Sequence, residues 1–317
     1  MSERQAAWFA RLALLALLVG PIIALALPPL GGDTAQFVLV QLRLPRLLAG
    51  LLVGGTLGLC GAATQAVFSN PLATPSTTGT LAGATLGALA ALVFAPAATI
   101  VGFSLVLICA FVGALVASFV VAVAAFGSRR RTEDVLLVGI AVTLATTALA
   151  TGVEDLADST AIVAANRWSL GNLAQIGYTR LGWMALPLIS VWALLLLQMR
   201  SLQNLVLGDD VAHARGVAVG RIRSTVLVLV ALGVAGAVAW CGPIAFVGLV
   251  VPQLVRLGVG GAQRIVLPGS LVAGAGLLVL CDALGRVVVP GRELSVGVVT
   301  ALLGAPAMAW LALRRSS

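Results

Sequence analysis

The chain has 317 residues, of which 60% are hydrophobic and only 9% are charged, and its mean hydropathy is +1.11. Because soluble proteins carry about 25% charged residues, this composition excludes a soluble globular protein and indicates an integral membrane protein. All nineteen basic residues are arginines. A phosphate-binding loop of the Walker type needs a lysine, so the sequence argues against ATP hydrolysis by this chain itself.

The net charge of +8 does not indicate nucleic-acid binding, because most arginines lie at the ends of apolar segments, where membrane topology accounts for them. The four cysteines, Cys60, Cys109, Cys241 and Cys281, lie within apolar runs and have no Cys-x-x-Cys spacing. This pattern predicts small buried side chains rather than a disulfide framework or a zinc site. We therefore expect this chain to bind no metal and no cofactor.

Charge-free runs, divided at breaks that contain proline or glycine, predict ten transmembrane helices, since each needs about 20 residues to cross the bilayer. The first run follows two arginines, as in a signal peptide, but it is long enough to span and shows no clear cleavage site. We expect it to be retained. The predicted spans are 12–30, 47–68, 79–96, 99–126, 135–153, 181–199, 224–240, 244–258, 266–285 and 294–313. The fold class is therefore all-α and polytopic, with residues 1–317 forming a single transmembrane domain.

The arginines orient these spans, because cytoplasmic loops of membrane proteins are enriched in positive charge. With the N-terminus in the cytoplasm, thirteen arginines fall inside and six fall outside. Both termini are then cytoplasmic. The outer six are Arg43, Arg46, Arg167, Arg180, Arg286 and Arg292.

The second predicted span begins at the sequence RLPRLLAG, so Arg43 and Arg46 lie on the outer side, against the usual bias. They are either membrane-edge anchors or contacts for a partner. The span continues with Gly50, Gly54 and Gly58, which share one helix face at a spacing of four residues. Such a stripe is typical of close helix packing, and a glycine-lined passage is the alternative.

Two connections contain more than simple turns. Residues 69–84 carry two prolines and seven Ser, Thr or Asn residues, which predicts a structured loop at the membrane edge. Residues 198–223 predict short helices on the cytoplasmic side, with a turn and a helix start at Gly208-Asp209-Asp210. This segment either lies on the membrane surface or docks into a cytoplasmic partner. His213, the single histidine, is expected to be an ordinary surface residue.

Ionisable residues are almost absent from the predicted spans. Asp282 is the exception, and Arg286 follows it by four residues, which predicts an ion pair within one helix. Proton- or sodium-coupled carriers usually keep a carboxylate or histidine relay near the bilayer midplane. The sequence therefore argues against secondary transport.

Five segments in this order resemble the permease subunits of ABC importers for iron chelates and vitamin B12. They are LRLPRLLAGLLVGG at 42–55, NPLATPSTTGTLAGATLG at 70–87, LGDDVAHARGV at 207–217, CGPIAFVGLVVPQLVR at 241–256 and ELSVGVVTALLGAP at 293–306. The resemblance covers residues from about 40 to 315. It implies a homodimer of ten-helix subunits in the bacterial inner membrane, whose translocation pathway is lined mainly by the fifth and tenth helices.

The same resemblance implies partners and site residues. Two cytoplasmic ATP-binding subunits would hold ATP and Mg, and a periplasmic binding protein would deliver a metal chelate. Glutamates of the binding protein would meet Arg43 and Arg46, with Arg286 as a further docking candidate. The segment that contacts the ATPase subunits would include Leu207, Gly208, Asp209, Asp210, Ala212 and Gly216.

The chain departs from the family pattern at three points that affect these expectations. Pro252-Gln253 replaces Pro-His, Glu293-Leu294-Ser295 replaces Glu-Leu-Pro, and Arg215 replaces an apolar residue.

We expect inward transport of a bulky chelate, with a ferric siderophore first, heme second and cobalamin third. An ion-coupled secondary transporter and a simple membrane anchor are the competing classes.

Overall fold

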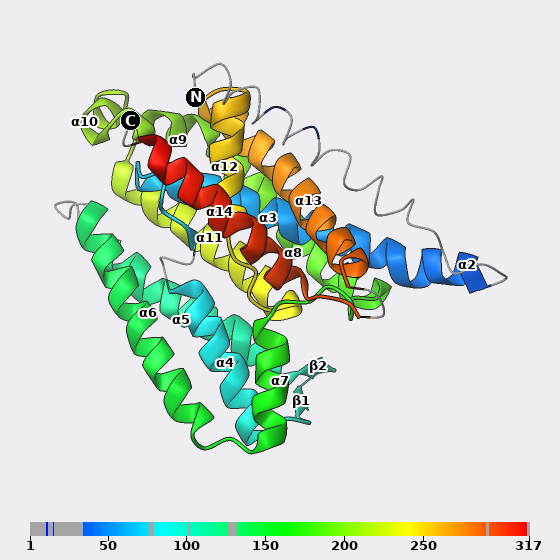
Figure 1. The fold of residues 1–317 in the computed structure, drawn as a ribbon. Helices are drawn as coiled ribbons and strands as arrows, with labels where there is room; N and C mark the ends of the chain where they lie inside the picture. Colours follow the sequence, from blue (N-terminus) through cyan, green and yellow to red (C-terminus); the bar gives the residue numbers. More distant parts are fainter. Residues whose placement is uncertain are drawn as a thin grey trace.

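The computed structural model describes residues 11, 15, 34–75, 79–100, 102–125, 132–289 and 292–315. Helices dominate these residues (Figure 1). The elements are α2 (Thr34–Phe37), the π-helical turn η1 (Val38–Arg43), α3 (Leu44–Val67), α4 (Thr80–Phe94), β1 (Thr99–Ile100), β2 (Phe103–Ser104), α5 (Leu105–Ala125), α6 (Thr132–Glu154), α7 (Ser159–Ser169), α8 (Tyr178–Leu197), α9 (Met199–Val206), α10 (Asp209–Ala214), α11 (Val219–Cys241), α12 (Val247–Gly258), α13 (Gln263–Val287) and α14 (Val296–Arg315).

Six helices of the described chain are long and apolar enough to cross a membrane. They are Val38–Val67, Leu105–Val123, Leu137–Glu154, Tyr178–Leu197, Val219–Cys241 and Gln263–Val287. Three shorter apolar helices, Thr80–Phe94, Val247–Gly258 and Val296–Trp310, correspond to further predicted spans. The predicted span 12–30 lies outside the described residues except for Leu15. The molecule is thus an all-helical polytopic membrane protein, as expected.

Several local features of the structure differ from the predictions or were not predicted. The predicted span 99–126 begins too early, because residues 99–104 form a small antiparallel hairpin of β1 and β2 and α5 starts only at Leu105. This hairpin is also an exception to a purely helical fold. Helix α7 was not predicted, since its 11 residues are too short and too polar to be recognised as a span. Asp158 caps it, accepting a hydrogen bond from the amide of Ala161.

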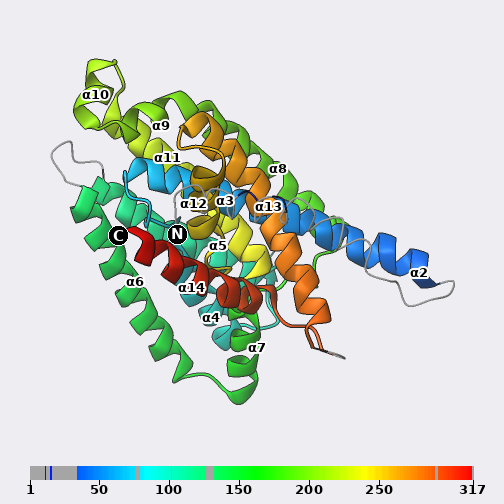
Figure 2. The same cartoon turned by 45° about the horizontal axis from the view of Figure 1, so that its top comes forward.

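Helix α3 lies at the centre of the molecule, and every residue from Val53 to Phe68 is buried. It packs along α13, and the two helices lie side by side in both views (Figures 1 and 2). A Cβ atom at Gly54 would lie 2.3 Å from the carbonyl oxygen of Gly274, and one at Gly58 would lie 2.2 Å from that of Ser270. At Gly50 the nearest atom would be Val279 Cγ2, at 3.0 Å. The glycine stripe thus lets two backbones approach closely.

The two ends of the helical body carry different structures. Helices α9 and α10 lie at one end, whereas α7 and the β1–β2 hairpin lie at the opposite end (Figure 1). The predicted cytoplasmic connection 198–223 therefore lies opposite two of the predicted outer connections, those that contain α7 and the β1–β2 hairpin. We refer below to the inner end, with α9 and α10, and the outer end, with α7 and the hairpin.

Candidate functional site

Four charged side chains meet where α3, α13 and the segment before α14 converge. The Nη2 atom of Arg46 lies 2.8 Å from Asp282 Oδ1, and its Nε donates a hydrogen bond to the same oxygen. The Nη1 atom of Arg46 donates to Glu293 Oε2, also at 2.8 Å. Arg286 Nε lies 3.5 Å from Asp282 Oδ2, an ion pair without hydrogen-bond geometry. We call these four residues the outer charge cluster.

Two members of this cluster are buried, so the cluster contributes to the fold as well as to the surface charge. The Asp282 side chain is 5% exposed and that of Arg46 is 12% exposed, whereas Glu293 is 56% exposed. A buried carboxylate must be neutralised, and the fork of Arg46 satisfies it through two nitrogens. The predicted pair of Asp282 and Arg286 is present, but Arg46 is the closer partner. Arg46 therefore ties α3 to α13 and to the segment before α14.

The three predicted docking arginines are brought close together, although only Arg46 and Arg286 belong to the outer charge cluster. Arg43 lies at the end of η1, one turn before Arg46, and is partly exposed. Arg46 and Arg286 both pair with the buried carboxylate of Asp282, and Arg46 also pairs with the exposed carboxylate of Glu293. The three arginines outnumber these two carboxylates. This leaves a positively charged rim.

At the inner end, α9 and α10 form a helical hairpin around the predicted turn. Gly208 has φ 110° and ψ 152°, and Gly216 has φ 76°; these are backbone conformations that L side chains rarely adopt. Helix α10 begins at Asp209, where the sequence placed a helix start. Ala212 is fully buried and its carbonyl accepts from the amide of Val217, which ends α10. These glycines and Ala212 are therefore needed for the shape of the segment.

Side-chain contacts fix this hairpin to α11. Arg223, which is 11% exposed, donates to both oxygens of Asp209 at 3.1 and 3.3 Å. Arg215, the departure from the family pattern, donates to Asn204 Oδ1 at 2.9 Å and so links α10 to α9. Leu207 is 49% exposed and Val211 is 39% exposed. The hairpin therefore presents apolar side chains on a rigid support at the inner end.

The departure at Gln253 has a clear structural role. Its Nε2 donates to the carbonyl of Pro71 at 2.6 Å and to Gln65 Oε1 at 3.3 Å, and Arg256 donates to the same Gln65 oxygen. Gln65 and Gln253 are buried. The network connects α3 and α12 to the loop that contains Pro71. The polar stretch after α3 is thus partly held by side chains, as non-helical backbone at membrane depth requires.

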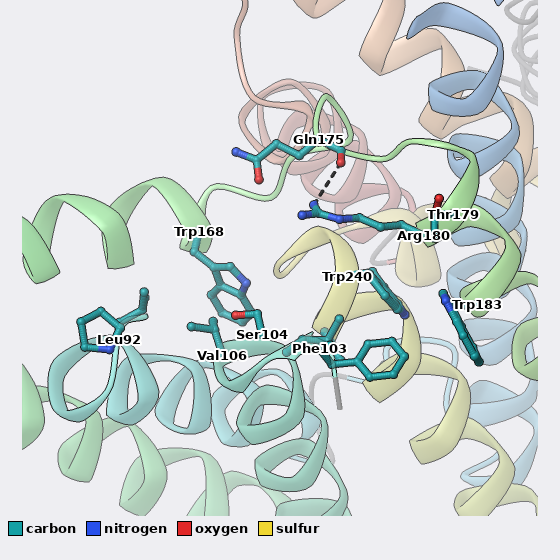
Figure 3. A pocket seen from close by; sticks show the side chains of 14 residues that line it. Leu92, Phe103, Ser104, Val106, Trp168, Gln175, Thr179, Arg180, Trp183 and Trp240 are labelled. Carbon is teal, nitrogen blue, oxygen red and sulfur yellow. Dashed lines mark hydrogen bonds between the residues drawn. The ribbon is translucent and has the colours of Figure 1, made fainter. Parts of the chain in front are cut away.

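An aromatic pocket opens at the outer end between α5, α8 and α11 (Figure 3). Its volume is about 620 Å³. Phe103 stands edge-on to Trp183 and to Trp240, with ring centroids 5.4 and 6.1 Å apart. Trp168 faces them across the pocket, and Arg180 lies above, donating to the carbonyl of Gln175 (Figure 3).

None of the predictions from the sequence included this pocket. The sequence contained a signal for it, because Trp183 and Trp240 lie at the ends of predicted spans, where tryptophan is enriched.

In the described part of the chain, no group of three or more His, Cys, Asp or Glu residues is placed to hold a metal ion.

The model of the FecCD transport family matches residues 8–314, which is almost the whole chain. The chain belongs to the FecCD transport family. The resemblance inferred from the five motifs is therefore confirmed. FecCD members are transport subunits, and this chain is accordingly a transmembrane permease subunit of an ABC transporter and is not catalytic.

Relatives within the family have different cargoes in their names. The vitamin B12 import system permease protein BtuC of Vibrio cholerae is 35% identical over 88% of this chain and 83% of its own length. The ferric enterobactin transport system permease protein FepD of Escherichia coli is 39% identical over 88% of this chain and 83% of its own length. These similarities make the chain a permease of an ABC importer for iron chelates, heme or vitamin B12.

A solved structure has the same fold. It is described as an inward-facing conformation of a candidate metal-chelate type ABC transporter, and it matches with a TM-score of 0.84 and 28% sequence identity. The match covers 96% of this chain and 99% of the other. A FecCD permease of this fold implies an ATPase partner and a binding-protein partner.

Proposed function

We propose that this permease carries a ferric siderophore or heme into the cytoplasm by ATP-driven alternating access. The observation that carries the proposal is the family match over residues 8–314. Vitamin B12 import by the same mechanism is the alternative, because BtuC relatives match equally well. ATP and Mg would be held by the partner subunits, since this chain has no lysine for a phosphate-binding loop.

The proposed topology has ten transmembrane helices in the bacterial inner membrane, with both termini in the cytoplasm. The arginine count of thirteen inside against six outside supports it. The separation of α9–α10 from α7 and the hairpin also supports it, since these connections must lie on opposite faces (Figure 1).

A homodimer is proposed, with the pathway beside α6 and α14. Both helices expose large apolar side chains, including Leu144 and Leu149 on α6 and Leu302 on α14, each at least 60% exposed. These two helices are the fifth and tenth of the proposed topology, which the family resemblance places along the pathway. Their exposed faces are available for a second copy of the chain.

Docking of a periplasmic binding protein is proposed at the positively charged rim of Arg43, Arg46 and Arg286. Guanidinium groups bind carboxylates in a bidentate manner, which suits recognition of glutamates on a partner. Because Glu293 is 56% exposed, an arriving carboxylate can compete with it for Arg46 without uncovering Asp282.

Coupling to the ATPase subunits is proposed through the α9–α10 hairpin. Leu207, Gly208, Asp209, Asp210, Ala212 and Gly216 form or support it. The exposed Leu207 and Val211 would enter an apolar groove on the partner, while Asp209 and Arg223 transmit its movement to α11. A rigid contact of this kind can convert closure of two ATPase subunits into a shift of membrane helices.

The ion-coupled alternative is less consistent with the side chains. Asp282 is the single acidic residue inside a predicted span, and it is ion-paired with Arg46 at the outer end. A relay carboxylate must exchange its proton or ion with water during transport. The geometry at Asp282 supports a structural role instead.

Competition for uptake tests the cargo. The permease is reconstituted in liposomes with its ATPase and binding protein, and uptake of a radiolabelled ferric hydroxamate siderophore is measured with excess unlabelled heme or cobalamin. We expect uptake of the siderophore that only unlabelled siderophore suppresses. Uptake of radiolabelled cobalamin is measured in parallel, and uptake of cobalamin without uptake of the siderophore would favour the alternative.

A further inference from the structure

The aromatic pocket adjoins an apolar groove between α5, α8 and α11. A second cavity of about 380 Å³ shares Leu107, Ala239 and Trp240 with the pocket. Its other walls include Pro187 on α8 and Gly236 on α11. Gly236 leaves room between the helices, because a Cβ there would already lie 3.3 Å from Leu188. The two cavities adjoin at these shared walls, and we refer to them together as the passage.

The two parts of this passage have different chemistry. The groove is lined almost entirely by hydrocarbon, whereas the mouth includes Ser104, Gln175, Thr179 and Arg180. A neighbouring hollow that shares Trp168 and Trp240 with the mouth adds Arg167. In the described residues, no Asp or Glu lines the mouth, this hollow or the groove. The mouth is therefore cationic, and the groove is apolar.

The length of the groove matches one leaflet of a bilayer. Its lining on α11 extends from Trp240 to Leu229. Eleven residues of α-helix span about 16 Å, since each residue adds about 1.5 Å. The hydrocarbon core of a bilayer is about 30 Å thick, so one leaflet occupies about 15 Å.

The mouth lies where a phospholipid headgroup would be. Tryptophan rings are enriched at the headgroup level of membranes, and Trp183 is 61% exposed beside Phe103. Guanidinium groups bind phosphate oxygens through paired hydrogen bonds. Among the described residues, the side chain of Arg180 is exposed and donates to the Gln175 carbonyl through Nη1, so its other nitrogens can bind a phosphate.

We propose that this passage binds one anionic phospholipid of the bilayer, with its phosphate at Arg180 and one acyl chain in the groove between α5, α8 and α11. The lipid holds the outer end of α8 against α11 and the hairpin, which are otherwise joined there mainly by aromatic contacts. The assignment goes beyond the transport function and does not depend on which cargo is carried. Assignment to the outer leaflet follows the proposed topology.

Native mass spectrometry of the purified full-length permease tests the site, with palmitoyl-oleoyl phosphatidylglycerol as the probe. Arg180→Gln removes the phosphate contact, and Ser190→Trp fills the groove from an exposed position on α8. We expect each variant to bind the tightest lipid about tenfold more weakly. Arg180→Gln loses one charged hydrogen-bonded contact, and Ser190→Trp fills the space that the acyl chain would occupy. Uptake is measured separately, so failure of this proposal does not resemble failure of the transport function.

Two matched controls distinguish a site from the general lipid shell. Arg200→Gln removes an exposed arginine at the inner end, and Ile189→Trp adds a tryptophan beside Ser190 on α8 but outside the groove. Both controls should retain the lipid. Equal retention in all four variants, or equal loss in all four, would overturn the proposal. Displacement of the lipid by inorganic phosphate alone would also overturn it, because it would show a simple anion site with no role for the groove.

Discussion

The guanidinium of Arg46 lies 2.8 Å from the carboxylate of Asp282, although the two residues are 236 positions apart in the sequence. This contact joins the first turn of α3 to the last turns of α13 at the outer end. It gives Arg46 a structural task in addition to the proposed docking role. The two roles predict different mutant behaviour.

Removal of the Arg46 side chain should destabilise the permease. Arg46→Ala leaves Asp282 buried with only the more distant Arg286 nearby, and breaking a buried ion pair costs about 3 kcal/mol or more. Thermal unfolding in detergent measures the loss. Arg292→Ala, which removes an exposed arginine just before Glu293, is the matched control and should unfold close to the wild-type temperature. Equal unfolding temperatures for Arg46→Ala and the wild type would contradict the structural role.

Charge reversal at Arg43 should weaken docking of the binding protein. Arg43→Glu replaces an attraction for carboxylates by a repulsion, so association with the binding protein should slow by about a factor of ten at low ionic strength. The difference should shrink as salt is added, because surface charges are then screened. Surface plasmon resonance with nanodisc-embedded permease measures both effects. Arg292→Glu reverses another exposed outer arginine, and an identical effect there would show that total charge matters rather than position.

An acidic residue at the tip of the α9–α10 hairpin should uncouple ATP hydrolysis from transport. Leu207→Asp puts a charge on a side chain that is 49% exposed, so the permease should still fold. Substrate-stimulated ATPase activity should fall by about tenfold, as expected when a buried apolar contact at an interface is replaced by a charge. Leu156→Asp, at an exposed leucine beyond α6, is the control and should leave the activity unchanged. Normal stimulation in Leu207→Asp would argue against this contact.

The glycine stripe should tolerate no added methyl group where α3 meets α13. Gly54→Ala would place a Cβ 2.3 Å from the Gly274 carbonyl oxygen, and overpacking of this kind costs about 2 kcal/mol. Gly182→Ala, in α8, meets no atom within 4 Å and should be neutral or stabilising. Unfolding of both variants in detergent provides the comparison. If Gly54→Ala were as stable as Gly182→Ala, α3 and α13 could move apart with no loss of stability, which would contradict the proposed need for close packing.

The fold class was predictable because each membrane span is a continuous apolar segment of the right length and can be recognised from neighbouring residues alone. The helix start at Asp209 was predictable for the same reason, since Gly208 and the two aspartates are adjacent in sequence. The pair of Asp282 and Arg286 followed from helical spacing. Each of these features depends on residues within a few positions of one another.

Contacts between distant segments were not predictable from one sequence. Nothing in the sequence pattern connects Arg46 to Asp282, because only the packing of α3 on α13 brings them together. Phe103 likewise meets Trp240 only because the β1–β2 hairpin packs on α11. Helix α7 was missed because 11 residues with a mixed composition resemble a loop. The family resemblance supplied roles for Arg43 and the α9–α10 hairpin, but it did not reveal that Arg46 is already bound within the chain.

ATP-dependent uptake in liposomes tests the central claim most directly. The permease is reconstituted with its binding protein and either the active ATPase subunit or a variant that binds ATP but cannot hydrolyse it, with no ion gradient across the membrane. We predict accumulation of the chelate only with the active subunit. Accumulation that continues with the inactive subunit and follows an imposed proton or sodium gradient would contradict the account.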